Sequence, residues 1–190
     1  MTNIKCENIT EEILQDYRQQ GFELVFQEYV MEHSLTDIPT IETPYSLSFK
    51  SWSPSSNEIF YEVYVASFRD RSGFPGWPIE KWVEWISGDP DFLPDKSYIA
   101  KVKDQAVGFI TAAQDSGKTG FIIQAGVIPE WRGKGIAAVL TAKCLEELRQ
   151  DGMKSAGLHV NQNNPGAIKL YERLGFKIIR KRGTFERSEK

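Results

Sequence analysis

The segment Gly126–Ala138 (GVIPEWRGKGIAA) constrains the fold of this chain more than any other. It begins at the end of a run of strand-forming residues, Phe121–Val127. Its two later glycines, Gly133 and Gly135, lead directly into a stretch with helical periodicity that ends before Gly152. One apolar stripe marks that helix, at spacings of three and four: Ile136, Val139, Leu140, Cys144 and Leu148. We therefore expect a strand, a tight turn and a long helix whose apolar stripe, Cys144 included, lies in the core.

The rest of the chain alternates between strand and helix patterns. Strand-forming composition predicts strands at 22–32, 45–52, 97–102, 106–113, 154–160 and 176–181, with a last short one at 184–187. Helical spacing and capping residues predict helices at 11–20, 55–67, 79–87 and 165–174. Turn-like residues separate the three strands between 97 and 127, which indicates an antiparallel meander. This order of elements indicates an α/β protein with a mixed (α+β) sheet.

Composition and charge exclude several classes of protein. A length of 190 residues favours one domain, or one domain plus an appendage, and 41% hydrophobic and 26% charged residues are ordinary for a globular protein. A net charge of -3 provides no basic field for nucleic acid. The two cysteines, Cys6 and Cys144, fit no metal spacing, and no apolar run approaches the ~20 residues of a membrane span. Residues 1–10 are too polar for a signal peptide, so we expect a cytoplasmic protein without metal, membrane or nucleic-acid partners.

The turn before the long helix has the chemistry of an anion site. A helix begins with about four unpaired backbone N–H groups and roughly half a positive charge. Glycines at 133 and 135 let the backbone approach a ligand closely, and Arg132 and Lys134 add positive charge. We expect an anion cradle that suits a pyrophosphate.

Two other nucleotide-binding motifs do not fit. Ser116–Thr119 (SGKT) ends like a P-loop, but Ala112 stands where the first glycine belongs and a strand follows, so we expect a hairpin turn. The spacing of Gly133, Gly135 and Ala138 would suit a dinucleotide fingerprint. The order of elements and the absence of an acidic residue at the end of the next strand argue against it.

Three segments resemble the GCN5-related N-acetyltransferase (GNAT) family. Its acyl-CoA motif is similar to Arg132-x-x-Gly135-x-Ala137, its second motif to Asn164-x-x-Ala167-x-x-x-Tyr171-x-x-x-Gly175-Phe176, and its central strand to Ala106–Ile110. The resemblance covers about residues 45–188, with the motifs in the family's order and at its distance. It implies a GNAT-like acyl-CoA N-acyltransferase fold, in which helices flank a central mixed sheet.

The resemblance also implies an activity. The chain would transfer an acetyl group from acetyl-CoA, its co-substrate, to a primary amine of a small molecule or peptide, by direct attack in a ternary complex and without a metal. Tyr171 would be the catalytic acid that protonates the departing thiolate. The residues implied to bind the co-substrate are Ala125, Val127, Arg132, Gly133, Lys134, Gly135, Ile136, Ala137, Asn164, Ala167 and Tyr171. Two alternatives stay open: a non-catalytic acyl-CoA-binding module, and an acyltransferase for protein N-termini or longer acyl chains.

The general base and the acceptor site are not readable from the sequence. Glu58, Glu62, Asp70 and His159 are candidates for the base, as is a relayed water, whereas Gln124 cannot act as one. The aromatic and glycine-rich loop at 69–77 either walls an acceptor pocket or covers the core.

Residues 1–40 are expected to form an N-terminal appendage to a GNAT domain at 45–190. Tyr17–Val25 echoes Tyr171–Ile179 at a constant offset of 154 residues. The echo indicates either an ordinary helix–glycine–strand junction or the remnant of a degenerate first GNAT repeat. Two-domain members such as mycothiol synthase, which the chain resembles more weakly, have such a repeat. The strand Phe22–Met31 is too apolar to stay in water, so it pairs with the main sheet or with a second subunit in a homodimer.

Overall fold

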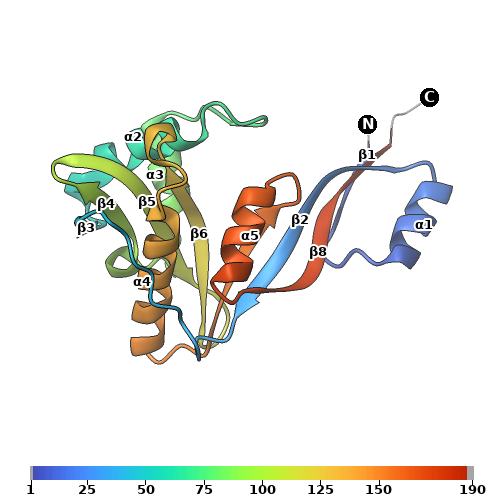
Figure 1. Ribbon diagram of the computed structural model, residues 1–190. Coiled ribbons are helices and arrows are strands. Elements are labelled where there is room, and N and C mark those ends of the chain that lie inside the picture. The colour runs from blue at the N-terminus through green and yellow to red at the C-terminus, as the bar shows by residue number, and fades with distance from the viewer. Residues whose placement is uncertain (1, 188–190) are drawn as a thin grey trace. The chain divides into compact units, whose positions relative to one another are not determined.

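The computed structural model describes residues 2–187 (Figure 1). These residues divide into two compact units. The terminal unit is formed by the two ends of the chain, residues 2–33 and 157–187, and the central unit is Ser34–Ala156.

The central unit contains the expected meander. Its antiparallel strands lie in the order β6 (Thr119–Val127), β5 (Gln105–Gln114), β4 (Tyr98–Val102) and β3 (Leu47–Ser51). A tight hairpin joins β5 to β6, in which the Asp115 N–H donates to the Thr119 carbonyl at 2.8 Å. Gly117 lies in that turn with φ +70°, so the SGKT sequence is a hairpin turn, as predicted.

Helices cover both faces of this sheet. Phe109 of β5 contacts rings of α2 (Asn57–Phe68) and α3 (Ile79–Ser87), whereas its neighbour Gly108 lies under Leu140 of α4 (Ile136–Gln150). Since successive strand residues point to opposite faces, α2 and α3 cover one face and α4 the other. Three short 3₁₀ helices, η1 (Pro54–Ser56), η2 (Pro94–Lys96) and η3 (Pro129–Trp131), precede α2, β4 and α4. Cys144 of α4 is fully buried, which confirms its place in the core.

The terminal unit is a second, smaller α/β assembly. Its elements are β1 (Thr2–Cys6), α1 (Glu11–Gln19), β2 (Glu23–His33), α5 (Pro165–Arg173) and β8 (Lys177–Arg187). With β7 (Ser155–Asn161), which enters from the central unit, its strands lie in the order β1-β8-β2-β7. Strand β8 runs antiparallel to both β1 and β2, and Ile9, Phe22 and Phe185 form the buried core.

Three outcomes in this unit bear on the sequence predictions. The strand expected at 22–31 exists and pairs with the last strand of its own chain. The strands expected at 176–181 and 184–187 are one continuous strand, β8, because its pairing with β2 continues through Arg182 and Gly183. Strand β1 was not predicted.

Candidate functional site

The turn between β6 and α4 adopts the conformation that its glycines allow. Gly133 has φ +73° and Gly135, the residue before the helix, has φ +80°. A side chain at either position would be strained by the left-handed backbone. A Cβ added at either glycine meets no protein atom within 4 Å. Both glycines therefore face open space at the start of α4.

This turn presents a row of free backbone donors. The Arg132 N–H donates to Pro129 at 3.2 Å, and the Val139 N–H donates to Gly135 at 3.1 Å. Between them, no acceptor within residues 2–187 binds the backbone N–H groups from Gly133 to Ala138. Consecutive N–H groups at a helix start, with no Cβ above them at two positions, can hold an anion such as a phosphate.

The side chains of Arg132 and Lys134 hold the shape of the turn. Arg132 donates from Nε to the Val127 carbonyl at 3.3 Å and from Nη2 to the Ser67 carbonyl at 3.0 Å, which joins the end of β6 to the end of α2. Lys134 donates to the Glu130 carbonyl at 2.9 Å. Both cations thus lie beside the turn, and each also binds a backbone carbonyl of the protein, a role that the sequence did not predict.

Trp131 anchors the turn to the sheet. Its indole N–H donates to the Gln105 side chain at 3.2 Å, and Tyr45 meets its ring edge-on at 5.1 Å. The ammonium of Lys134 lies 4.7 Å from the centre of the same ring. Sequence reasoning missed this residue as an anchor, although a tryptophan in an otherwise polar turn was the available signal.

At the end of β6, one backbone N–H points away from the neighbouring strand β5. The Ile128 N–H donates to the Val107 carbonyl of β5 at 3.1 Å. Because N–H groups of successive strand residues point to opposite edges, the Val127 N–H points away from β5. It lies on the same strand end from which the turn leads to the free donors of α4.

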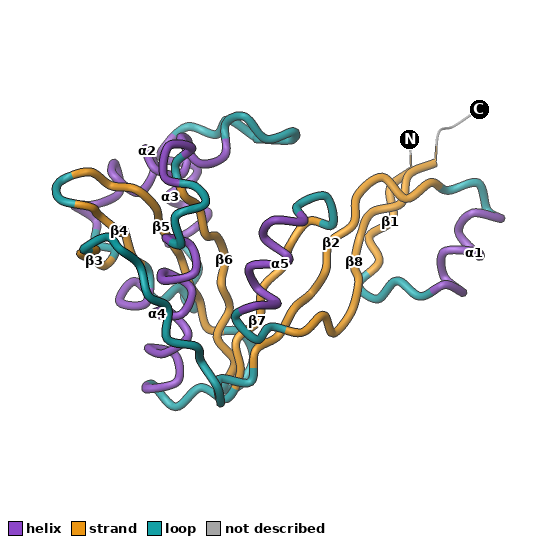
Figure 2. Tube along the Cα trace, viewed as in Figure 1, coloured by secondary structure: helices purple, strands orange, loops and turns teal. Residues whose placement is uncertain are grey.

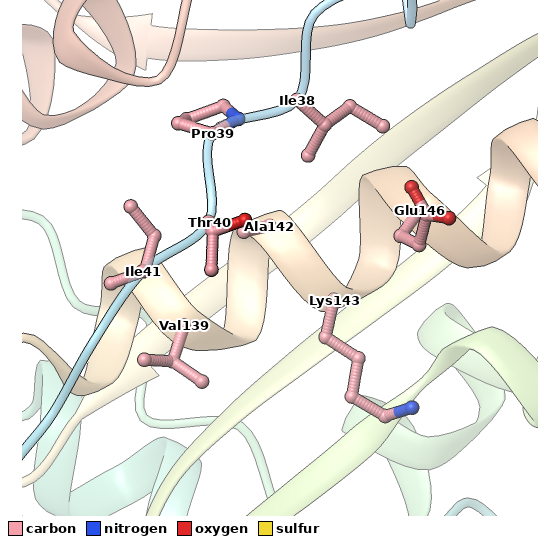
Figure 3. A pocket seen from close by; sticks show the side chains of 8 residues that line it. All are labelled: Ile38, Pro39, Thr40, Ile41, Val139, Ala142, Lys143 and Glu146. Atoms are coloured by element: carbon pink, nitrogen blue, oxygen red, sulfur yellow. The ribbon is translucent and has the colours of Figure 1, made fainter.

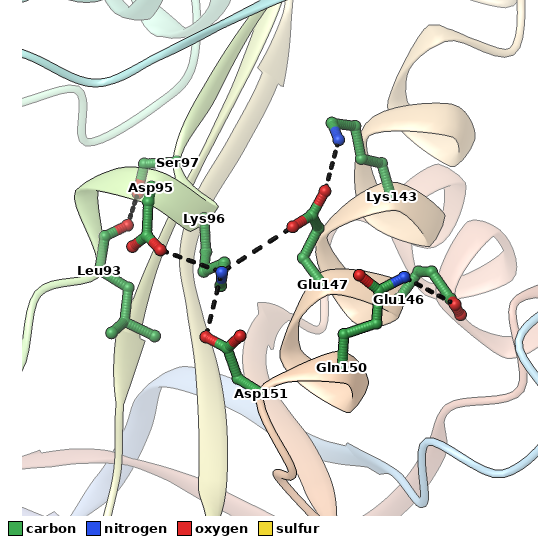
Figure 4. A network of polar contacts seen from close by, with 9 residues as sticks. All are labelled: Leu93, Asp95, Lys96, Ser97, Lys143, Glu146, Glu147, Gln150 and Asp151. Atoms are coloured by element: carbon green, nitrogen blue, oxygen red, sulfur yellow. Dashed lines mark hydrogen bonds and ion pairs between the residues drawn. The ribbon is translucent and has the colours of Figure 1, made fainter.

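An ion network around the buried side chain of Lys96 fixes the opposite end of α4 (Figure 4). The side chain of Lys96 is 9% exposed, and its Nζ lies 3.0 Å from Asp95 and 3.0 Å from Asp151. Burial acts to lower the pKa of Lys96, but the hydrogen bonds to the two carboxylates outweigh it and raise that pKa. Glu147 adds a contact to Lys96 at 3.8 Å. The network holds the last turn of α4 on η2, so the helix that carries the free donors is held at its far end.

The connector between β2 and β3 crosses α4 (Figure 2). Residues 38–41 line a groove of about 270 Å³ with four residues of the helix: Val139, Ala142, Lys143 and Glu146 (Figure 3). Lys143 points away from the connector and pairs with Glu147 at 2.7 Å. The groove thus lies between the connector and α4, and most of the side chains that line it are aliphatic.

The remaining predicted residues lie in the terminal unit. Asn164 caps α5, because its side-chain oxygen accepts from the Ala167 N–H at 3.2 Å. Tyr171, on the same helix, is 9% exposed, and its ring centre lies 5.5 Å from that of Phe176. The candidates from Ala125 to Ala137 therefore belong to the central unit, and Asn164, Ala167 and Tyr171 belong to the terminal unit.

The structure also places the residues considered for the base and the acceptor. Glu58 and Glu62 are exposed on α2, and Asp70 follows that helix with an ion pair to Arg69 at 3.8 Å. His159 lies on β7. The side chain of Gln124 accepts from the Trp82 indole at 3.2 Å.

The aromatic loop after α2 packs inward. Phe74 and Trp77 both pack against the core cluster of the central unit, and the Tyr61 hydroxyl donates to the Trp77 carbonyl at 2.7 Å. Among residues 2–187, no group of three or more His, Cys, Asp or Glu could hold a metal ion. No helix in the described part of the chain is long and apolar enough to cross a membrane.

Fold and turn together define a class: mixed α/β proteins with unbonded backbone N–H groups where a strand passes into a helix. Within that class, the chain belongs to the acetyltransferase (GNAT) family, whose model matches residues 57–176. The resemblance on which the sequence predictions rested is thereby confirmed, as is the expected fold class.

Similar proteins include mycothiol acetyltransferases and an N-alpha-acetyltransferase. A mycothiol acetyltransferase of Thermobispora bispora is 29% identical over 148 residues, which are 74% of this chain and 50% of that protein. The N-alpha-acetyltransferase 30 of Schizosaccharomyces pombe is 34% identical over 87 residues, 44% of this chain and 58% of that protein. A GCN5-related N-acetyltransferase of Sphaerobacter thermophilus has the same fold, with a TM-score of 0.82 and 23% identity over 96% of this chain and 58% of that one. The chain spans about half the length of the mycothiol acetyltransferases that it matches.

Proposed function

We propose that this chain is an acetyl-CoA-dependent N-acetyltransferase. The observation that carries the proposal is the row of free backbone N–H groups from Gly133 to Ala138, within the segment that the family model matches. GNAT acetyltransferases use acetyl-CoA as co-substrate. Its pyrophosphate has the charge and the acceptor oxygens that such donors and a helix start favour.

The residues would act at three points of the reaction. Backbone N–H groups at Gly133–Ala137 would bind the pyrophosphate, and the Val127 N–H would polarise the thioester carbonyl. The neutral amine attacks the carbonyl carbon, the carbon–sulfur bond breaks, and the amine loses a proton to water or to a carboxylate. The Tyr171 hydroxyl would give its proton to the departing thiolate, because a phenol is protonated at neutral pH. Acetyl-CoA supplies the acetyl group, and coenzyme A leaves as the free thiol.

The acceptor is an amine whose identity does not follow from the relatives. One relative is named for a small thiol and another for protein N-termini, and this chain spans only part of each. The partial match to the N-alpha-acetyltransferase favours a peptide N-terminus as the second candidate acceptor. Small amines and short peptides therefore both belong in a first panel.

Two measurements test the proposal in sequence. Calorimetric titration with acetyl-CoA should show binding to the full chain, and Gly135→Val should weaken it strongly while the variant stays folded. Release of free thiol across the panel of amines and peptides should then exceed the hydrolysis rate without acceptor. Binding without release on any acceptor would favour the non-catalytic binding module, and absence of binding would refute the proposal.

A further inference from the structure

The segment β1–α1–β2 repeats β7–α5–β8 element by element. A shift of 154 residues carries the bounds of α1 (Glu11–Gln19) onto those of α5 (Pro165–Arg173), and the bounds of β2 onto those of β8. The same shift places β1 within β7. An ordinary helix–glycine–strand junction would account for one shared boundary, not for all of them.

Local contacts repeat as well. Thr10 and Asn164 cap the two helices, each accepting from the N–H three residues on, at 3.3 and 3.2 Å. After each helix, the phenylalanine N–H returns to the tyrosine carbonyl, at 2.9 Å in one copy and 3.0 Å in the other. The corresponding rings lie 5.8 Å apart for Tyr17 and Phe22, and 5.5 Å apart for Tyr171 and Phe176.

The pairing of β2 with β8 is symmetric under the same shift. When each residue is exchanged for its counterpart, Leu24↔Phe185 becomes Met31↔Ile178, and Phe26↔Thr184 becomes Val30↔Arg180. The two register shifts leave Val25 and Ile179 out of the ladder, and these residues are counterparts too. Only the pair Glu28↔Arg182 maps onto itself.

The terminal unit therefore has a pseudo-two-fold axis between Glu28 and Arg182. The flanking strands obey it, since β1 lies beside β8 and β7 lies beside β2. This is the arrangement by which two identical chains form a symmetric dimer, in which each residue meets its own counterpart. Here both halves come from one chain.

The charges of the two strands show why β2 pairs with β8 better than a second copy of β8 would. Strand β2 carries three glutamates and no lysine or arginine, whereas β8 carries five basic residues and one glutamate. At the axis, Glu28 and Arg182 form an ion pair at 3.1 Å. Two copies of β8 in the same arrangement would place Arg182 opposite Arg182, and like charges directly opposite are unfavourable.

We propose that β1–α1–β2 is an internal copy of β7–α5–β8, and that it occupies within one chain the two-fold interface that β8 would otherwise offer to a second copy. Strand β8 is paired along both edges, by β1 and by β2, so self-association through it is blocked. This proposal does not depend on the proposed function.

Engineered cysteines at the axis test it on the full chain. In a Cys6→Ser background, the double variant Glu28→Cys/Arg182→Cys should form a disulfide within one chain under mild oxidation and keep the 21.7 kDa mass of the monomer. The single variant Arg182→Cys should give no covalent dimer above background, because the new thiol does not face the same position of a second copy. Glu28→Cys/Glu186→Cys is the matched control, since Glu186 pairs with Glu23 and not with Glu28.

Each outcome decides the matter. A covalent dimer of Arg182→Cys would show that β8 meets β8 of a second copy, and a covalent dimer of the double variant would show that β2 pairs with another chain; either overturns the proposal. The neighbouring pair, Tyr29→Cys/Lys181→Cys, serves as a second site, because adjacent antiparallel pairs alternate in geometry. If both pairs keep their free thiols in folded protein, the internal pairing is refuted.

Discussion

Substitution of Gly135 should affect the stability of the fold and the affinity for acetyl-CoA by different amounts. In Gly135→Ala the new Cβ meets no protein atom within 4 Å, so the cost to stability comes from the left-handed backbone alone, φ +80°. That strain is about 1–2 kcal/mol, which lowers the melting temperature by roughly 2–8 °C for a chain of this size. The same methyl group stands in the open space that we assign to the pyrophosphate. Loss of one charge-assisted hydrogen bond, about 1.5–3 kcal/mol, corresponds to a roughly 10- to 150-fold weaker affinity for acetyl-CoA.

The matched control is Gly152→Ala, just beyond the other end of α4. Gly152 also has φ +80° and open space around an added Cβ, so the expected cost to stability is the same. Thermal unfolding followed by circular dichroism should show similar shifts for both variants, and calorimetric titration should show weakened acetyl-CoA binding for Gly135→Ala alone. If both variants bind acetyl-CoA like the wild type, or if both lose it equally, the assignment of the cradle is refuted.

Three further results are expected. Tyr171→Phe should lower kcat about 100-fold or more on an accepted amine, while the affinity for acetyl-CoA stays within a few-fold. The control Tyr17→Phe, at the corresponding position of the N-terminal copy, should leave kcat unchanged. Equal rates for the wild type and Tyr171→Phe would make Tyr171 a packing residue. Arg132→Met should lower the free energy of unfolding, measured by denaturant titration, by about 1–3 kcal/mol, because the variant loses two hydrogen bonds to backbone carbonyls, one of them at Ser67. Arg132→Lys should not restore both hydrogen bonds. An unchanged denaturation midpoint in Arg132→Met would contradict this role. Burial raises the pKa of the Cys144 thiol from 9.0 to about 12, so only the unfolded chain ionises between those values. Stability should then fall by up to about 1.4 kcal/mol per pH unit above pH 9, and the fall should be shallower in Cys144→Ala; parallel pH profiles for the two proteins would count against it.

Local patterns predicted the elements whose burial is decided by their own residues. The stripe from Ile136 to Leu148 predicted α4 because a helix with one buried face repeats its apolar residues every three or four positions. The meander was predictable because polar turn residues separate its strands. The SGKT sequence is a hairpin turn between two of these strands, so a short motif can be interpreted only together with the elements on either side of it.

Elements that depend on distant partners were not predictable. Strand β1 is mostly exposed, with only Ile4 and Cys6 partly buried, and it exists because β8 provides its hydrogen-bond partners. The buried ammonium of Lys96 likewise depends on Asp151, which is remote in sequence.

The candidate site likewise has features that were predictable from the sequence and features that were not. The sequence predicted the glycines and the helix start, since these are backbone requirements of a turn. It did not predict that the Arg132 guanidinium would bind the ends of β6 and α2, because that contact joins residues 65 positions apart. Side-chain roles in a turn follow from what surrounds it in space.

The proposed function requires that the backbone N–H groups from Gly133 to Ala138 bind the phosphates of the co-substrate. Titration of ¹⁵N-labelled protein with acetyl-CoA, followed by amide NMR spectra, observes these groups individually. We expect the amide signals of residues 133–138 to show the largest downfield shifts and to become protected from hydrogen exchange. Signals from these residues that stay in place at saturation, with the shifts gathered instead around the groove of residues 38–41, would contradict it.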